Sequence, residues 1–137
     1  RTYEGEPAMK LESTALQGRD VLQIEPIIKS SIIDTSQLLE EIYTNLGRFN
    51  TADLAFSAES YIARSLAELA VEAAEIKGVS AVGFTGGVAC NEHIHKIIKK
   101  IIEDNNLIFI SHDAVPPGDG GISLGQAAVA AMKHNKM

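Results

Sequence analysis

Residues 85–91 (TGGVACN) join two glycines to an asparagine where an apolar run gives way to a helical pattern. Glycine lets the backbone approach a ligand closely, and free N–H groups at a helix start favour an anion. Asn91 would lie near the mouth of such a site, with a donor and an acceptor to contact a base or sugar. The simpler reading is that Gly86 and Gly87 only make a tight turn. The Walker loop and the GxGxxG fingerprint are both absent.

Residues 116–121 (PPGDGG) place one carboxylate among glycines at the tip of a loop that precedes a helix. The Asp119 carboxylate is unshielded there and could hold a metal ion through oxygen. It could equally cap the last helix, and spacing alone favours this second reading. Residues 3–7 (YEGEP) are a third candidate, because the turn around Gly5 sets two carboxylates beside a helix start, although such a segment is more often only a turn.

The histidines and the single cysteine do not complete a catalytic set. His93 and His95 are two residues apart on a predicted helix, so they point to nearly opposite faces and cannot hold one metal ion. These two, His112 and His134 are all expected to be exposed polar residues. Cys90 has no identifiable base nearby and is expected to be buried filler. We therefore predict no catalytic residue in this chain.

Hydrophobic spacing predicts mainly helices in the first half of the chain. The predicted elements are a helix from Pro7 that stops at Gly18, short strands at 21–24 and 31–33, a helix from 34–36 to Gly47, and a helix from 51–53 to about Lys77. Thr51 or Asp53 would cap the longest helix and Gly78 would end it. Its apolar residues recur every three or four positions and predict one continuous apolar stripe, made of Leu54, Ala58, Ile62, Leu66, Leu69, Ala73 and Ile76.

The second half of the chain has the pattern of a βαβ unit. A buried parallel strand is predicted at 79–84, an amphipathic helix at 88–105 and a second strand at 107–110. Such a unit is right-handed. A last helix is predicted at 122–134. The fold class is therefore α/β, with a small sheet covered by helices.

The overall composition is that of one ordinary domain. The 137 residues are 45% hydrophobic and 22% charged, and the length suits a single domain spanning 1–137. The formal net charge of −6 argues against a nucleic-acid binder. No apolar run is long enough to predict a membrane span. Cys90 is alone, so no internal disulfide can form, which fits a reducing cytoplasm.

Taken together, the three glycine-bearing segments resemble the HypF carbamoyltransferases of NiFe-hydrogenase maturation. Residues 3–12 (YEGEPAMKLE), 84–91 (FTGGVACN) and 115–127 (VPPGDGGISLGQA) are similar to the corresponding HypF segments in order and spacing. The last block is the most specific. The second is shared with the tRNA threonylcarbamoyl transferases and the O-carbamoyltransferases. The resemblance implies one lobe of an actin-like nucleotide-binding fold.

The resemblance also implies roles for individual residues. Gly86 and Gly87 would line the site for ATP or carbamoyl-adenylate, with Asn91 near the adenosine. Asp119 would bind a divalent metal together with two histidines of an upstream HxxxH motif. The turn around Gly5 would contact the nucleotide. The implied activity is transfer of a carbamoyl group, through carbamoyl-adenylate, to the C-terminal cysteine of the partner HypE.

Several positions depart from the family pattern. Glu6 replaces the second glycine that the tRNA enzymes have, which favours the HypF branch. Gly118 stands where HypF usually has asparagine, and Ser57 where many HypF chains have histidine. The HxxxH motif and the first lobe are absent, so we expect a segment excised from a longer chain and inactive alone. A strand edge left uncovered would favour homodimerisation.

Two alternatives remain open at this point. The chain could be a free-standing nucleotide-binding or scaffold module without catalysis. It could also belong to a tRNA threonylcarbamoyl or O-carbamoyl transferase, although the PPGDGGISLGQA block speaks against this.

Overall fold

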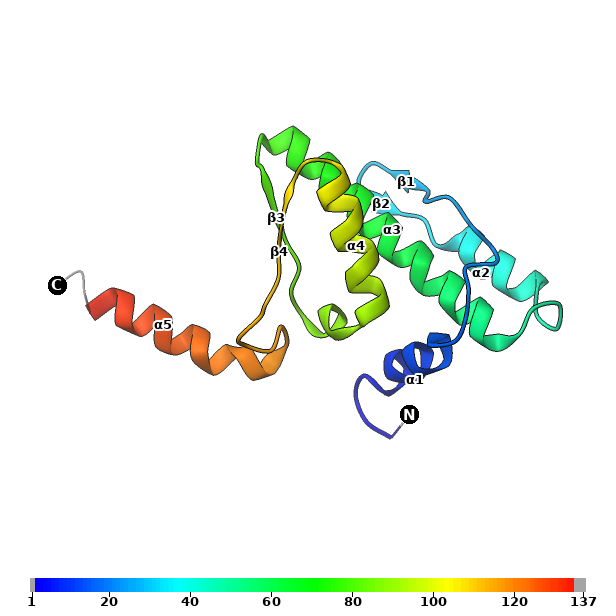
Figure 1. Cartoon of the computed structure of the whole chain (residues 1–137), viewed down its shortest axis with the longest axis horizontal. Coiled ribbons are helices and arrows are strands. Elements are labelled where there is room, and N and C mark those ends of the chain that lie inside the picture. The colour runs from blue at the N-terminus through cyan, green and yellow to red at the C-terminus, as the bar shows by residue number, and fades with distance from the viewer. Residues whose placement is uncertain (1, 135–137) are drawn as a thin grey trace.

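The computed structural model describes residues 2–134 and is organised around one long helix, α3 (Figure 1). The elements in chain order are α1 (Glu6–Ala15), β1 (Ile28–Lys29), β2 (Ile32–Ile33), α2 (Ser36–Thr44), α3 (Thr51–Lys77), β3 (Ala81–Gly83), the 3-10 turn η1 (Gly87–Cys90), α4 (Glu92–Asp104), β4 (Ile108–Ile110), the 3-10 turn η2 (Asp119–Gly121) and α5 (Ile122–His134). Helices α1, α2 and α4 all pack against α3. The predicted α/β class is therefore confirmed.

Helix α3 is buried on two sides, and the single apolar stripe expected from the sequence is wrong. One hydrophobic cluster joins Ala63 and Ala67 to the isoleucine face of α4. A second cluster surrounds Tyr61, which contacts residues of α2 and of the preceding loop. Leu54 of the expected stripe is buried, but Leu66 is 37% exposed and Ile76 is 76% exposed, so the stripe does not follow the buried surface of α3. Most buried residues of α3 are alanines and serines, which allow two partners to approach one helix closely.

Strands β3 and β4 form a parallel pair with α4 as the connection, as predicted (Figure 1). The strand β3 is only half-buried, however, and Ile108 and Ile110 of β4 are exposed. The expectation of a fully buried strand is therefore wrong for residues 2–134, in which only one face of this sheet is covered. The loops that follow β3 and β4 leave the sheet at the same edge, because the carboxyl ends of parallel strands coincide.

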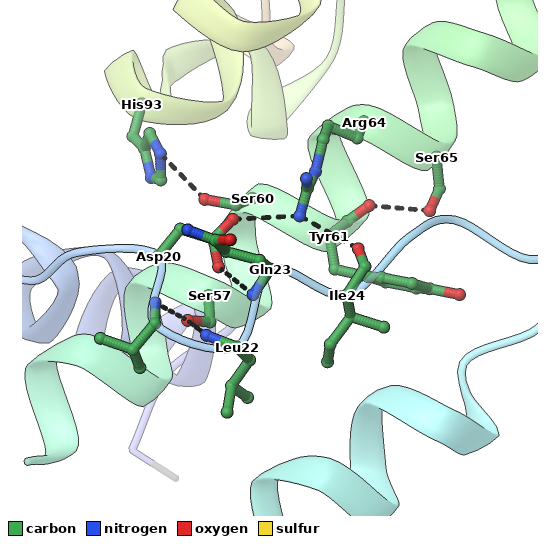
Figure 2. Close-up of polar contacts among 11 residues, drawn as sticks. Asp20, Leu22, Gln23, Ile24, Ser57, Ser60, Tyr61, Arg64, Ser65 and His93 are labelled. Carbon is green, nitrogen blue, oxygen red and sulfur yellow. Dashed lines mark hydrogen bonds and ion pairs between the residues drawn. The ribbon is translucent and has the colours of Figure 1, made fainter. Parts of the chain in front are cut away.

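Residues 21–24 are not the predicted strand, because side chains of α3 take the place of a strand partner (Figure 2). The Ser57 hydroxyl accepts hydrogen bonds from the backbone N–H groups of Val21 at 3.0 Å and Leu22 at 3.2 Å. Arg64 donates to the carbonyl of Ile24 at 3.0 Å and also pairs with Asp20. The expected strand at 31–33 is found as β2, which pairs with β1 in an antiparallel hairpin.

Two helix starts differ from the predicted ones. The cap of α3 is Asn50, whose side chain accepts a hydrogen bond from the N–H of Asp53, while Gly78 ends the helix with φ 63° as expected. Helix α4 starts at Glu92 and not at 88, because residues 87–90 form η1 and the side chain of Asn91 caps α4. Both caps satisfy backbone N–H groups that a helix start leaves without partners.

Helix α5 has the predicted bounds, Ile122–His134, and projects away from the other helices (Figure 1). Its principal contacts are with η2. None of the helices among residues 2–134 combines the length and the apolar character needed to cross a membrane.

Candidate functional site

Two glycine-bearing loops meet at the carboxyl edge of the β3–β4 pair. The N–H of Gly86 donates a hydrogen bond to the carbonyl oxygen of Pro117 at 2.8 Å. The Thr85 hydroxyl donates to the same oxygen at 3.0 Å. A Cβ atom built on Gly118 would lie 3.9 Å from the Cα of Gly87, so the two backbones lie close together. The two corners that the sequence singled out separately are therefore one place in the structure, at the edge where parallel sheets commonly bind ligands.

The side chain of His112 forms a hydrogen bond at the contact between the two loops. The Nε2 atom of His112 lies 3.0 Å from the Thr85 hydroxyl oxygen. Because the only hydroxyl hydrogen of Thr85 goes to Pro117, His112 must donate from Nε2. The exposure predicted for His112 is confirmed, but its hydrogen bond was not foreseen.

The corner at residues 86–88 presents unpaired backbone donors. Gly86 has φ 98° and ψ 175°, a conformation open essentially only to glycine. Within residues 2–134, the N–H groups of Gly87 and Val88 have no hydrogen-bond acceptor. A side chain at Gly87 would meet nothing within 4 Å, so open space lies beside these donors. Adjacent unpaired N–H groups at such a corner suit an anion.

Asp119 is the first residue of η2, and its carboxylate is exposed. No hydrogen bond or ion pair of this carboxylate is formed with residues 2–134, so the capping role that spacing favoured is not found. In the same part of the chain no three His, Cys, Asp or Glu side chains gather as a metal site. Asp119 fits a metal as a single oxygen ligand, and further ligands would have to come from elsewhere.

Asn91 is buried, and most of its side-chain amide is already engaged. Its Oδ1 atom accepts a hydrogen bond from the N–H of Ile94 at 2.9 Å. Its Nδ2 atom donates to Oε1 of Glu59 at 2.8 Å. An amide nitrogen carries two hydrogens, so one N–H is left for any contact with a nucleotide. One of the two lone pairs of Oδ1 is likewise used inside the chain.

The remaining candidate side chains correct three expectations. His93 and His95 are half-buried and not exposed: His93 stacks on Phe56 with ring centroids 3.8 Å apart, whereas His95 packs edge-on against Phe109. Their different partners agree with the prediction that they cannot hold one metal ion. Cys90 is exposed and not buried filler, because it lies in η1 and not on the buried face of a helix. The side chain of His134 lies outside the described residues.

Gly5 is the N-cap of α1 with φ 81°, and lies on a different element from the two joined corners. The next residue, Glu6, is buried and pairs with Lys10 at 2.7 Å. The N–H and hydroxyl of Thr2 also donate to its carboxylate. The Lys10 ammonium and then the Thr2 N–H lower the pKa of Glu6 from 4.5 to about 2. A charged Glu6 therefore fixes the turn that carries Gly5.

This arrangement predicts an acid-sensitive turn. A carbon-detected NMR titration of the Glu6 carboxyl should give a pKa of about 2. Because the folded pKa is depressed, the stabilisation by Glu6 is complete above the unfolded value and disappears as the pH falls through the folded one. Lys10→Met should raise the pKa toward 4.5, since Lys10 is the largest cause. An unchanged pKa in that variant would contradict the assigned cause.

A cavity of about 320 Å³ separates the last turns of α1 from the first turn of α4. It is lined by Glu12, Ala15, Leu16, Phe56, Glu59, Glu92, His93 and Lys96. At its rim, Lys96 pairs with Glu92 at 2.7 Å and lowers the pKa of Glu92. Helix α1, which follows the Gly5 turn, and helix α4, which Asn91 caps, thus face each other across this cavity.

Comparison with known proteins finds relatives that align with nearly the whole chain. Residues 1–126 match the family model described as carbamoyltransferase, Kae1-like domain, second subdomain. Over 98% of its own length, the chain is 37% identical to the probable carbamoyltransferase HypF of Methanocaldococcus jannaschii. It is 30% identical, over 80% of its length and 33% of the relative, to the tRNA N6-adenosine threonylcarbamoyltransferase of Thermococcus gammatolerans.

Solved structures agree with this placement. The crystal structure of T. kodakarensis HypF aligns over 99% of the chain with a TM-score of 0.85 and 39% identity. A full-length HypF in the phosphate- and nucleotide-bound form aligns over 95% with a TM-score of 0.78 and 26% identity. The chain spans 18% of the length of each of these HypF proteins.

Proposed function

Because the chain belongs to the family of the second Kae1-like subdomain of carbamoyltransferases, we propose that it forms one lobe of the nucleotide site of a HypF-type enzyme. The complete enzyme, of which these residues would be a part, is called the parent enzyme below. The observation that carries the proposal is the contact between Gly86 and Pro117, which unites the corners of two of the three segments that resemble HypF. The unpaired N–H groups of Gly87 and Val88 would bind a phosphate of ATP or carbamoyl-adenylate.

The proposed reaction is carbamoyl transfer to a thiol. The parent enzyme would hydrolyse carbamoyl phosphate to carbamate and phosphate. The carbamate oxygen would then attack the α-phosphate of ATP, so that carbamoyl-adenylate forms and pyrophosphate leaves. The C-terminal cysteine of HypE would then attack the carbamoyl carbon, so that a C–S bond forms, the C–O bond to the phosphate breaks, AMP leaves and the thiol proton is released. The resulting thiocarboxamide would supply the cyanide ligands of hydrogenase iron, in the cytoplasm.

The contribution of this chain would be positional and electrostatic. Its backbone donors would hold the adenylate phosphate in one place, which raises the rate by removing the need to orient the reactants. Asp119 would supply one oxygen ligand to a divalent cation. The positive charge of the cation would offset the negative charge of the phosphates. Histidines from the remainder of the parent enzyme would complete that ligand set.

The uncovered apolar surface supports the proposal that the rest of the parent enzyme packs against this lobe. Four large apolar side chains of α5 are exposed, namely Ile122, Leu124, Val129 and Met132. Ile108 and Ile110 of the nearby sheet are also exposed. An apolar area of this kind is characteristic of an interface. The same surface would support homodimerisation of the isolated chain.

The direct test compares the isolated chain with the parent enzyme. The parent enzyme, given carbamoyl phosphate, ATP and HypE, should release AMP and form a HypE thiocarboxamide that mass spectrometry detects. The isolated chain should show neither product, because it lacks the first lobe and the metal histidines. Turnover by the isolated chain, or a parent enzyme that carbamoylates no thiol, would refute the proposal.

A further inference from the structure

Glu59 is a buried carboxylate that the proposed chemistry does not use. It lies in the first half of α3 and is 2% exposed. Removing a carboxylate from water costs several kcal/mol unless its oxygens are well paired. Both oxygens are paired here, one with Asn91 at 2.8 Å and the other with His93 at 3.1 Å. The carboxylate therefore bridges two residues at the start of α4.

The bond to Glu59 fixes the orientation of the Asn91 amide. The N–H of Ile94 requires an acceptor, so the amide oxygen must face α4. A carboxylate requires a donor, so the amide nitrogen must face Glu59. Neither contact tolerates a flipped amide, which would set oxygen against oxygen at Glu59 and two N–H donors against each other at Ile94. The backbone N–H of Asn91 also donates to the carbonyl of Val88 at 3.0 Å, which ties the same residue to η1.

His93 in turn holds the carboxylate. Its Nδ1 atom lies 3.1 Å from Oε2 of Glu59, within hydrogen-bond distance. Its Nε2 atom lies 3.4 Å from the hydroxyl of Ser60, which can donate to it (Figure 2). The stacking of the ring on Phe56 prevents it from turning away. A carboxylate held from two sides cannot rotate to release Asn91.

We propose that Glu59 is a positioning residue for nucleotide binding, because it fixes the Asn91 amide beside the Gly86–Gly87 corner so that the one remaining N–H meets the nucleotide in a single orientation. Glu59 matters in this way only if Asn91 contacts the nucleotide, which is part of the proposed function. Glu59 itself touches no substrate.

The test is a double-mutant cycle in the parent enzyme. Glu59→Met fills the space without an acceptor, whereas Glu59→Gln keeps an acceptor for Asn91. Asn91→Ser keeps a helix cap and removes the amide. The dissociation constant for ATP is measured by calorimetry for each variant and for the double variant Glu59→Met/Asn91→Ser. The KM for ATP and kcat are measured in parallel, and thermal melts establish that each protein is folded.

Glu59→Met should weaken ATP binding about 10-fold and raise KM more than it lowers kcat, as the loss of a residue that orients a ligand contact does. Glu59→Gln should bind ATP within about threefold of the native enzyme, since it still accepts from Asn91. The double variant should bind no more weakly than Asn91→Ser alone, because the effect of Glu59 passes through Asn91.

Three results would overturn this role. If folded Glu59→Met bound ATP with native affinity while Asn91→Ser bound it more weakly, Glu59 would have no positioning role. The proposed function would then remain intact. Losses that multiply in the double variant would show that Glu59 acts without Asn91. Native ATP affinity in Asn91→Ser would show that Asn91 makes no contact with the nucleotide. Glu59 would then have no positioning role either.

Discussion

Replacing Asp119 with asparagine is expected to lower carbamoyl transfer by the parent enzyme on the order of 100-fold, because a bound cation contributes several kcal/mol to stabilising phosphate charge. Asparagine keeps the size of the side chain but loses the charge that a divalent cation requires. The fold should be unaffected, since the Asp119 carboxylate is exposed and has no partner among residues 2–134. The apparent affinity for Mn²⁺ in the presence of ATP should fall together with the rate.

Asp113 offers a matched control for this substitution. It lies in the same loop and is also exposed, but it is outside the GDGG corner. Asp113→Asn removes the same charge from the chain and should leave both the rate and the Mn²⁺ affinity close to native. Equal losses in the two variants would indicate a general effect of loop charge. Native Mn²⁺ affinity in Asp119→Asn would contradict a role as a metal ligand.

The periodic elements were predictable because each carries its information locally. The isoleucines of α4 return every three or four residues, and Ile94, Ile98 and Ile102 are indeed its buried residues. The start of α5 follows from the glycines and the proline pair before it. The two glycine corners could also be named, because the segments that contain them resemble HypF segments.

The polar interior of α3 could not be predicted from one sequence. Ser57, Glu59 and Arg64 have the composition of a solvated helix face, yet the first two are buried. Their partners lie 32 to 44 residues away, in segments with no spacing rule that points back to α3. Residues 21–24 were misread for the same reason, because a β-like run whose N–H groups bond to a serine looks the same in sequence as a strand. The contact of Thr85 with His112 has no sequence signal either.

The candidate site was therefore predictable as a set of corners and not as a network. Gly86, Gly87 and the loop of Asp119 come together, whereas the work of Asn91 is divided between a cap, a buried carboxylate and one free N–H. That division follows from burial, which forces every polar atom of a side chain to find a partner. Sequence motifs name the residue but not its partners.

Adjacent glycines at the corner allow folding to be separated from ligand binding. Gly86→Ala should destabilise the 137-residue chain, because φ 98° and ψ 175° are strained for any other residue by about 1–3 kcal/mol. A melt of the chain should show a Tm lowered by several degrees, roughly 4–12 °C for a domain of this size. Relief of the strain would also move the Gly86 N–H away from Pro117 and part the two corners.

Gly87→Ala should behave differently, because the backbone of Gly87 is not in the left-handed region and a Cβ there would meet nothing within 4 Å. Its Tm should therefore stay close to native. In the parent enzyme, however, the added methyl group would stand in the open space beside the N–H groups of Gly87 and Val88, where we propose that a phosphate binds. ATP affinity should fall in both variants, with a loss of folding stability only in Gly86→Ala. Native ATP affinity in a stably folded Gly87→Ala enzyme would mean that no phosphate approaches this corner, since an occupied site could not admit the methyl group without cost.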